Sequence, residues 1–183
     1  ILIFILLLSF NIYAQNNSES LKNSEIYINV GKYKEALDIL KNLENLSIKE
    51  NAKRDNLLGK LYFALGKYNK ANEFFEMAAL ADSEKHEYLV GLAESYYALG
   101  KLKIAKSNAQ FAIRADPDLI EAQLILAKID ATLGNENEAK NRFEELKSLQ
   151  PSNEYIILNY AKLLESRSKI SEAVKLIKDF IKK

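Results

Sequence analysis

The sequence predicts an all-α protein built from stacked helical hairpins, and three observations support this fold class. Residue types recur at a spacing of 34 residues, as at Gly66, Gly100 and Gly134. Apolar residues within each period follow the i, i+3, i+4, i+7 spacing of an amphipathic helix. The chain contains only two prolines and six glycines, which are costly inside helices. A period of this length indicates one supersecondary unit that is stacked several times.

The chain opens with an apolar run unlike anything that follows it. Residues Ile1 to Leu8 are all apolar, and polar residues take over by Asn16. The run is short for a transmembrane helix, and its length is typical of a secretory signal. We therefore expect residues 1–14 to be a signal peptide cleaved after Ala14, with an uncleaved membrane anchor as the alternative. No cysteine follows, so a lipoprotein anchor is not expected.

The periodicity predicts ten helices, paired in five repeats. In the second repeat, one apolar stripe ends at Leu65 and the next begins at Tyr68. Gly66 lies between them, where a helix end often needs positive φ. The predicted helices span 18–29, 33–46, 50–65, 68–81, 85–99, 102–115, 118–133, 136–149, 152–167 and 170–182. The predicted repeats span about 17–50, 52–85, 86–119, 120–153 and 154–183, in one continuous domain of residues 15–183.

Repeat boundaries and helix contacts have their own residue preferences. Pro117 and Pro151 are 34 residues apart, and each is placed to open a first helix, where proline is tolerated. Close helix contacts require small side chains. We expect these at Gly59, Ala93, Ala127 and Ala161 on first helices, and at Ala36, Ala71, Ala105, Ala139 and Ala173 on second helices. Large side chains are expected to fill the gaps between hairpins at Tyr27, Tyr62, Tyr96, Phe75, Phe143 and Ile177.

This pattern resembles the tetratricopeptide repeat, a helix–turn–helix unit with L-G-x₂-Y followed by A-x₃-F and a closing proline. Leu58 to Tyr62 supplies the first part, Ala71 to Phe75 the second, and Pro117 and Pro151 the last. The resemblance covers about five repeats. It implies a right-handed α-solenoid whose first helices line a concave groove that binds a partner peptide or protein segment.

Two positions depart from the repeat pattern. Asp130 stands where the preceding repeats carry tyrosine, at Tyr62 and Tyr96. We expect it to be a looser, partly solvated packing point, with a partner contact as the alternative, because charged residues are seldom buried unpaired. Ser168 replaces the turn glycine of the fifth repeat.

The last predicted helix carries three apolar residues, Val174, Ile177 and Ile181, whose exposure would favour self-association.

Composition excludes several function classes. With 26 basic and 25 acidic residues, the chain shows no electrostatic footprint for nucleic acid. It has no cysteine, and its single histidine, His86, is expected to be a solvated surface residue. We predict that the chain is not an enzyme and has no catalytic, cofactor-binding or metal-binding residues. No cofactor is expected, and a membrane contact is expected only through an uncleaved N-terminal segment.

The resemblance therefore predicts a non-catalytic scaffold, exported to a bacterial periplasm or cell envelope, with a self-assembling structural module as the alternative. The positions that it assigns to the partner-binding groove are Lys53, Asn56, Lys60, Phe63, Glu87, Val90, Glu94, Tyr97, Glu121, Leu124, Lys128, Tyr155, Leu158 and Lys162. Exposed aromatic side chains ringed by polar groups suit protein recognition. The alternative for Phe63 and Tyr97 is that they cover the next hairpin.

Overall fold

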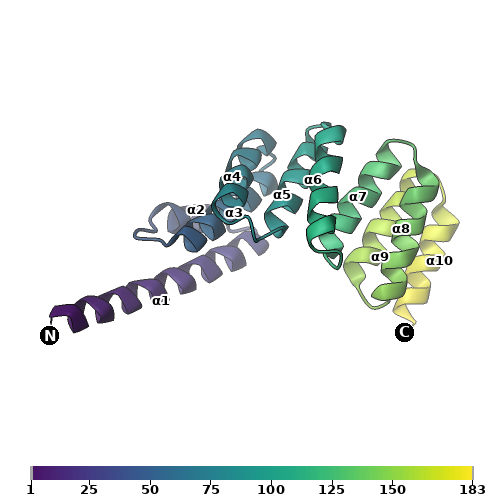
Figure 1. Cartoon of the computed structure of the whole chain (residues 1–183). Helices are drawn as coiled ribbons and strands as arrows, with labels where there is room; N and C mark the ends of the chain where they lie inside the picture. The colour runs from purple at the N-terminus through teal and green to yellow at the C-terminus, as the bar shows by residue number, and fades with distance from the viewer. Residues whose placement is uncertain (1, 183) are drawn as a thin grey trace. The chain divides into compact units, whose positions relative to one another are not determined.

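The computed structural model describes the backbone of residues 2–182 and the side chains of residues 16–182. It contains ten α-helices and, within that span, no strand (Figure 1). The helices are α1 (Leu2–Asn29), α2 (Tyr33–Lys41), α3 (Ile48–Ala64), α4 (Tyr68–Ala81), α5 (Glu87–Ala98), α6 (Leu102–Ala115), α7 (Ile120–Thr132), α8 (Glu136–Leu149), α9 (Glu154–Ser166) and α10 (Ile170–Ile181). The all-α prediction is confirmed.

The chain divides into two compact units, residues 1–101 and 102–183. The division falls at the turn of the third predicted repeat, between α5 and α6, although the sequence predicts one continuous domain. In the first unit, α3 packs against both α1 and α4, and α4 also packs against α5. In the second unit, α7 packs against α6, α8 and α9, and α9 packs against α10. The boundaries predicted for the repeats and the signal segment remain predictions.

The five hairpin turns share one hydrogen-bonded geometry. After α3, the Gly66 amide donates to the Phe63 carbonyl and the Lys67 amide donates to the Tyr62 carbonyl, both over 2.9 Å. This pair of bonds satisfies carbonyls at the helix end and requires a left-handed residue at the glycine position. Gly66 has φ of 70° and Ser168 has φ of 58°, so serine adopts the same left-handed conformation at the last turn. The predicted turn positions are confirmed.

One connection differs from its prediction. α2 ends at Lys41, earlier than the predicted residue 46, and α3 begins at Ile48. Ser47 caps α3, because its hydroxyl accepts from the Glu50 amide while the Glu50 carboxylate accepts from the Ser47 amide over 2.8 Å. This capping box fixes the start of α3. The apolar periodicity alone contains no information on such a cap.

Small residues lie where the sequence predicts close helix contact. A Cβ added to Gly59 would lie 2.6 Å from the Phe75 ring, and one added to Gly91 would lie 2.5 Å from it. The Phe75 ring of α4 therefore fits between α3 and α5 only because both positions lack a side chain. The alanines predicted at the equivalent contacts are all buried. The repeat pattern thus encodes the spacing of neighbouring helices.

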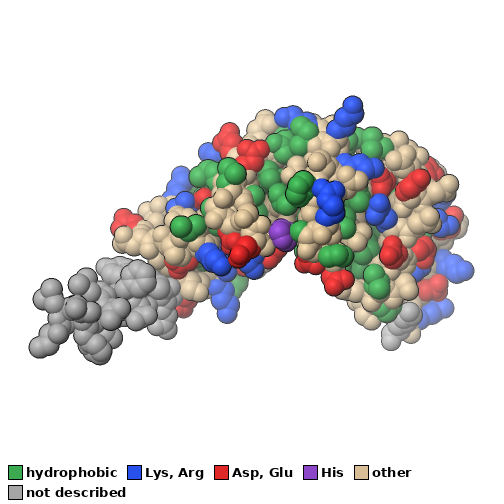
Figure 2. Space-filling model, viewed as in Figure 1, with side chains coloured by type: hydrophobic (Ala, Val, Ile, Leu, Met, Phe, Trp, Pro, Cys, Tyr) green, Lys and Arg blue, Asp and Glu red, His purple; other side chains and the backbone are tan. Residues whose placement is uncertain are grey.

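The predicted signal segment, residues 1–14, lies outside the residues whose side chains are described. Among the described residues, no helix is both long and apolar enough to span a membrane. On the face seen in Figure 2, basic and acidic side chains are interspersed over each unit. This mixture agrees with the near balance of charges in the sequence.

Candidate binding face

The candidate site is the solvent-facing side of the first helices, described separately in each unit. Equivalent positions of adjacent first helices lie side by side. In the first unit, the Lys60 ammonium of α3 lies 3.3 Å from the carboxylate of Glu25, the equivalent residue on α1, which is 35 residues earlier in the chain. This ion pair neutralises both charges on that face. Lys53, also on α3, is exposed.

The aromatic side chains on this face of the first unit are packed down onto the protein. Phe63 is half-buried, contacts the core of the unit, and lies 5.2 Å from the Tyr68 ring between centroids. Tyr97 is also half-buried. Glu87 is exposed and pairs with Lys85 at 3.6 Å. These contacts give Phe63 a packing role against the core and the second helix of its own hairpin.

The second unit presents apolar side chains to solvent at the equivalent positions. Tyr155 and Leu158 on α9 are 47% and 43% exposed. They share a helix face with Lys162, which is exposed, because the three residues follow the i, i+3, i+7 spacing. The Lys128 ammonium of α7 lies 5.8 Å from the centre of the Tyr155 ring, within cation–π range. Lys128 of α7 and the three α9 residues therefore lie on one face that spans both helices.

Local interactions fix the orientation of α9. The Asn153 side chain caps the helix, accepting from the Tyr155 amide over 3.0 Å. Ile156 and Tyr160 are buried on the other side of the helix. The Asn159 side chain donates to the Tyr155 carbonyl over 2.7 Å. With one side anchored in the core, α9 must turn Tyr155 and Leu158 towards solvent.

Three of the predicted groove residues are not available at the surface. Asn56, Val90 and Leu124 are buried, and Leu124 is part of the core cluster of the second unit. For these three, the expectation of an exposed contact is wrong, because the helix faces turn them inward. Glu94 and Lys128 are half-buried, whereas Glu121 is exposed. Whether any of the remaining positions binds a partner stays a prediction.

Asp130 differs from its prediction. It is only 2% exposed, so it is not a solvated packing point. Its carboxylate accepts from the Lys106 ammonium of α6 over 2.8 Å and from the Arg142 guanidinium of α8 over 3.1 Å. Burial alone would raise the pKa of Asp130, but these hydrogen bonds and positive charges outweigh it and hold the pKa below its usual range. The aspartate ties three helices together.

The sequence contains a signal for the two basic partners of Asp130. Arg142 lies twelve residues after Asp130, on the second helix of the same repeat, and Lys106 lies on the second helix of the preceding repeat. A buried acid predicts basic partners on the neighbouring helices.

His86 is half-buried at the start of α5. Within the described span, no three His, Asp or Glu side chains gather in a group that could hold a metal ion.

Comparison with known proteins decides the fold. A sequence model of the tetratricopeptide repeat matches residues 56–84, which lie in α3, α4 and the following turn. The same hairpin geometry recurs at each turn of the described chain. The chain has the tetratricopeptide-repeat fold. No curated protein matches the sequence.

Solved structures with this fold are similar over most of the chain. The thermophilic tetratricopeptide protein TTC0263 of Thermus thermophilus is 21% identical, with 91% of this chain and 90% of that chain covered, at a TM-score of 0.79. PilF of Pseudomonas aeruginosa is 16% identical, with 93% and 77% covered, at a TM-score of 0.74. A MamA crystal structure is 20% identical, with 87% and 92% covered, at a TM-score of 0.63. At these identities the likeness concerns the fold. The tetratricopeptide fold generally serves protein–protein interaction and not catalysis.

Proposed function

We propose that this chain is a non-catalytic scaffold that binds a protein or peptide segment through the face formed by α7 and α9. The observation that carries the proposal is the pair of exposed apolar side chains, Tyr155 and Leu158. Such side chains, flanked by charged ones, supply the buried centre of protein interfaces. Lys128 and Lys162 flank this pair, and a polar rim of this kind orients a partner.

A difference between the two units supports this choice of face. The Lys60 position in the first unit is neutralised by Glu25, whereas the equivalent positions in the second unit are both lysine, Lys128 and Lys162. Lys162 makes no ion pair among the residues with described side chains. A partner with acidic groups beside an apolar residue would complement this face.

The test is crosslinked co-purification of the full chain from its native cells, compared with a Tyr155→Ala/Leu158→Ala double variant. The matched control is Leu80→Ala/Leu149→Ala, which removes two side chains that are 86% and 72% exposed on second helices. We expect a partner that the native chain and the control both capture and the double variant loses. Equal capture by all three proteins would refute the proposed face.

We also propose that the chain is exported to a bacterial periplasm or cell envelope. The support is the opening sequence, in which Ile1 to Leu8 are all apolar and Ala14 is suitably placed before a cleavage point. Mass spectrometry of the native N-terminus is the test. A mature chain that begins near Gln15 is expected, and an uncleaved segment in the membrane fraction would favour an anchor instead.

Self-association through α10 is a second candidate. Ile170, Val174 and Ile181 are 62%, 44% and 74% exposed on this helix, whereas Ile177, which the sequence analysis grouped with them, is half-buried against the core of the second unit. Exposed apolar faces often mark interaction sites. Light scattering tests this candidate, since Val174→Lys/Ile181→Lys should convert an oligomer into a monomer. A native chain that is monomeric at high concentration would exclude it.

A further inference from the structure

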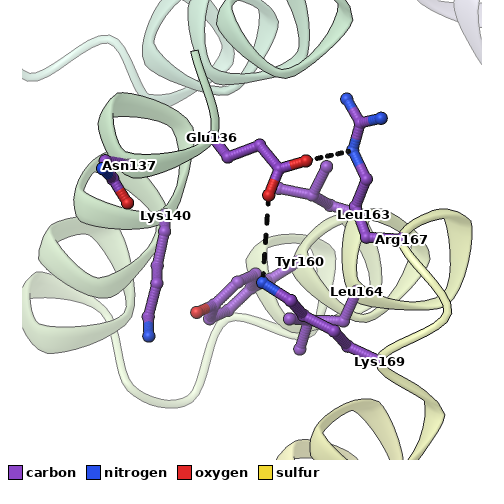
Figure 3. A pocket seen from close by; sticks show the side chains of 8 residues that line it. All are labelled: Glu136, Asn137, Lys140, Tyr160, Leu163, Leu164, Arg167 and Lys169. Atoms are coloured by element: carbon purple, nitrogen blue, oxygen red, sulfur yellow. Dashed lines mark ion pairs between the residues drawn. The ribbon is translucent and has the colours of Figure 1, made fainter. Parts of the chain in front are cut away.

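A small cleft in the second unit combines several cationic side chains with an apolar floor (Figure 3). Its walls come from the start of α8, the end of α9 and the turn before α10. At 100° per residue, its α9 residues Tyr160 and Leu163 lie on a different side of the helix from Tyr155 and Leu158. The cleft is therefore separate from the proposed binding face.

Glu136 already shows that a carboxylate fits in this cleft. Its two oxygens lie 3.4 Å from the Arg167 Nε and 3.9 Å from the Lys169 Nζ. Figure 3 shows the Glu136 carboxylate between these two cations, with Lys140 on the α8 side. Both distances are longer than the roughly 2.7–2.9 Å of a strong charge-assisted hydrogen bond. The Arg167 guanidinium also donates a hydrogen bond to the Ala131 carbonyl, which restrains its position.

The cations of the cleft outnumber its carboxylates. Lys140, Arg167 and Lys169 line it together with one acid, Glu136. Lys140 makes no ion pair in the part of the chain whose side chains are described. Glu144, which accepts the Tyr160 hydroxyl over 2.9 Å, is paired with Lys147. Burial would raise the pKa of Glu144, but hydrogen bonds from Lys147 and Tyr160 lower it, and the charge of Lys140 also helps to lower it, so Lys140 is partly compensated. The excess positive charge of the cleft therefore comes mainly from Arg167 and Lys169, which share the Glu136 carboxylate.

We propose that this cleft binds a second carboxylate, carried by a ligand whose apolar group packs on the half-buried Leu163 side chain. The cavity has a volume of about 50 Å³. A single water needs roughly 10–15 Å³ on the same measure, so the cavity holds one small anionic group and not a whole ligand. A free carboxylic acid and an acidic side chain of a peptide share this chemistry. The proposal is independent of the α7–α9 binding face.

The test is a nuclear magnetic resonance titration of the full chain at low ionic strength, where exposed charges are least screened. N-acetyl-leucine supplies a free carboxylate, and the end-blocked peptide acetyl-Leu-Glu-Leu-amide supplies a side-chain carboxylate. N-acetyl-leucinamide is the neutral control of matched shape. We expect saturable shifts at the amides of residues 136–140 and 160–169 with one or both acids. The acid that binds identifies the source of the carboxylate.

Two variants separate this site from a purely structural ion-pair cluster. Lys140→Met should weaken acid binding about threefold, the value of one surface ion pair. Glu136→Gln should strengthen binding about threefold, because it removes the internal competitor for Arg167 and Lys169. Glu138→Gln, on the same helix but outside the cleft, should leave binding unchanged. Circular dichroism checks that each variant is folded.

Three results would each overturn the proposal. The first is that the neutral amide shifts the same signals as the acids. The second is that none of the acids gives saturable shifts. The third is that folded Lys140→Met binds as tightly as the native chain, or that folded Glu136→Gln binds no more tightly than Glu138→Gln.

Discussion

One pair of positions in the hairpin is filled by aromatic rings in the first unit and by an ion pair in the second. Tyr62 and Phe74 stack with their ring centroids 5.3 Å apart and their planes 9° apart. Two repeats later, Asp130 and Arg142 occupy the same positions and are joined by a 3.1 Å hydrogen bond. Tyr62 and Asp130 are both buried, at 7% and 2% exposure.

The difference shows that position in the repeat fixes proximity and burial, but not chemistry. Residues twelve apart meet across each hairpin because the turn returns the second helix along the first. The fifth repeat has Leu164 and Leu176 at the same two positions. Leu164 belongs to the core of the second unit, and Leu176 packs against that core. These two positions therefore accept either two apolar side chains that pack together or two polar side chains that form a hydrogen-bonded pair. A buried polar group without such a partner would be costly.

The largest effect is expected at the aromatic pair. Tyr62→Ala should lower the free energy of unfolding of the first unit by about 3 kcal/mol, because it removes a large buried ring and leaves a cavity. Tyr62→Phe keeps the ring and is the matched control. Native-state hydrogen exchange of α3 amides measures the loss locally. A loss under about 1 kcal/mol would mean that the stack is not an important contact.

The ion pair should be somewhat less costly to break. Asp130→Asn keeps the side-chain size but leaves Lys106 and Arg142 without a counter-charge. Because both are one-third exposed and partly rehydrate, we expect a loss of about 2 kcal/mol. Hydrogen exchange of α7 amides measures it. An unchanged exchange rate would contradict a stabilising role for the network.

The pH dependence of the two losses should differ. The pKa of Asp130 is lower in the folded chain than in the unfolded chain, where it is near 3.9. Its stabilisation is therefore complete above about pH 4 and is lost as the pH falls through the folded pKa. The difference between the native chain and Asp130→Asn should shrink on acidification below about pH 4. The difference caused by Tyr62→Ala should persist while the unit remains folded.

Transplanting the aromatic pair and its apolar neighbour should have a smaller effect. Lys106→Leu, Asp130→Tyr and Arg142→Phe together give the second unit the residues of the first at the equivalent positions. Replacing a buried ion network by packed apolar groups is often neutral, so we expect a change within about 1 kcal/mol. Asp130→Tyr alone should lower the free energy of unfolding more, since it leaves Lys106 and Arg142 without a counter-charge. A triple variant as unstable as the single one would show that the positions are not interchangeable.

The smallest effect is expected at the turns. Ser168→Gly should stabilise the second unit by about 0.5–1 kcal/mol, because glycine adopts the observed φ of 58° without strain. Gly134→Ser, the reverse change at the preceding turn, should cost a similar amount. Chemical denaturation followed by circular dichroism compares the two. Opposite signs are expected, and equal signs would contradict the shared turn geometry.

The sequence by itself determined the all-α class, the number of helices and their turns, although α1 begins at Leu2 and the periodicity predicts its start at residue 18. Periodicity and the turn glycines are local properties, so the start of α4 at Tyr68 and the position of Ser168 were both predictable. The small residues were predictable for the same reason, since a recurring alanine or glycine marks a recurring contact. The end of α2 was not, because Asn45 adopts a positive φ of 56° in a connection outside the repeat pattern.

Only the tertiary structure decided which residues face solvent and which charges are paired. Val90 and Leu124 occupy positions assigned to the groove, yet their side chains are buried, while Tyr155 and Leu158 remain exposed. The repeat pattern gives each helix its angular positions, but the packing of its neighbours decides how much of each side chain is covered. The pairing of Asp130 likewise depends on α6 and α8 meeting at α7, which joins residues 24 and 12 positions away in sequence.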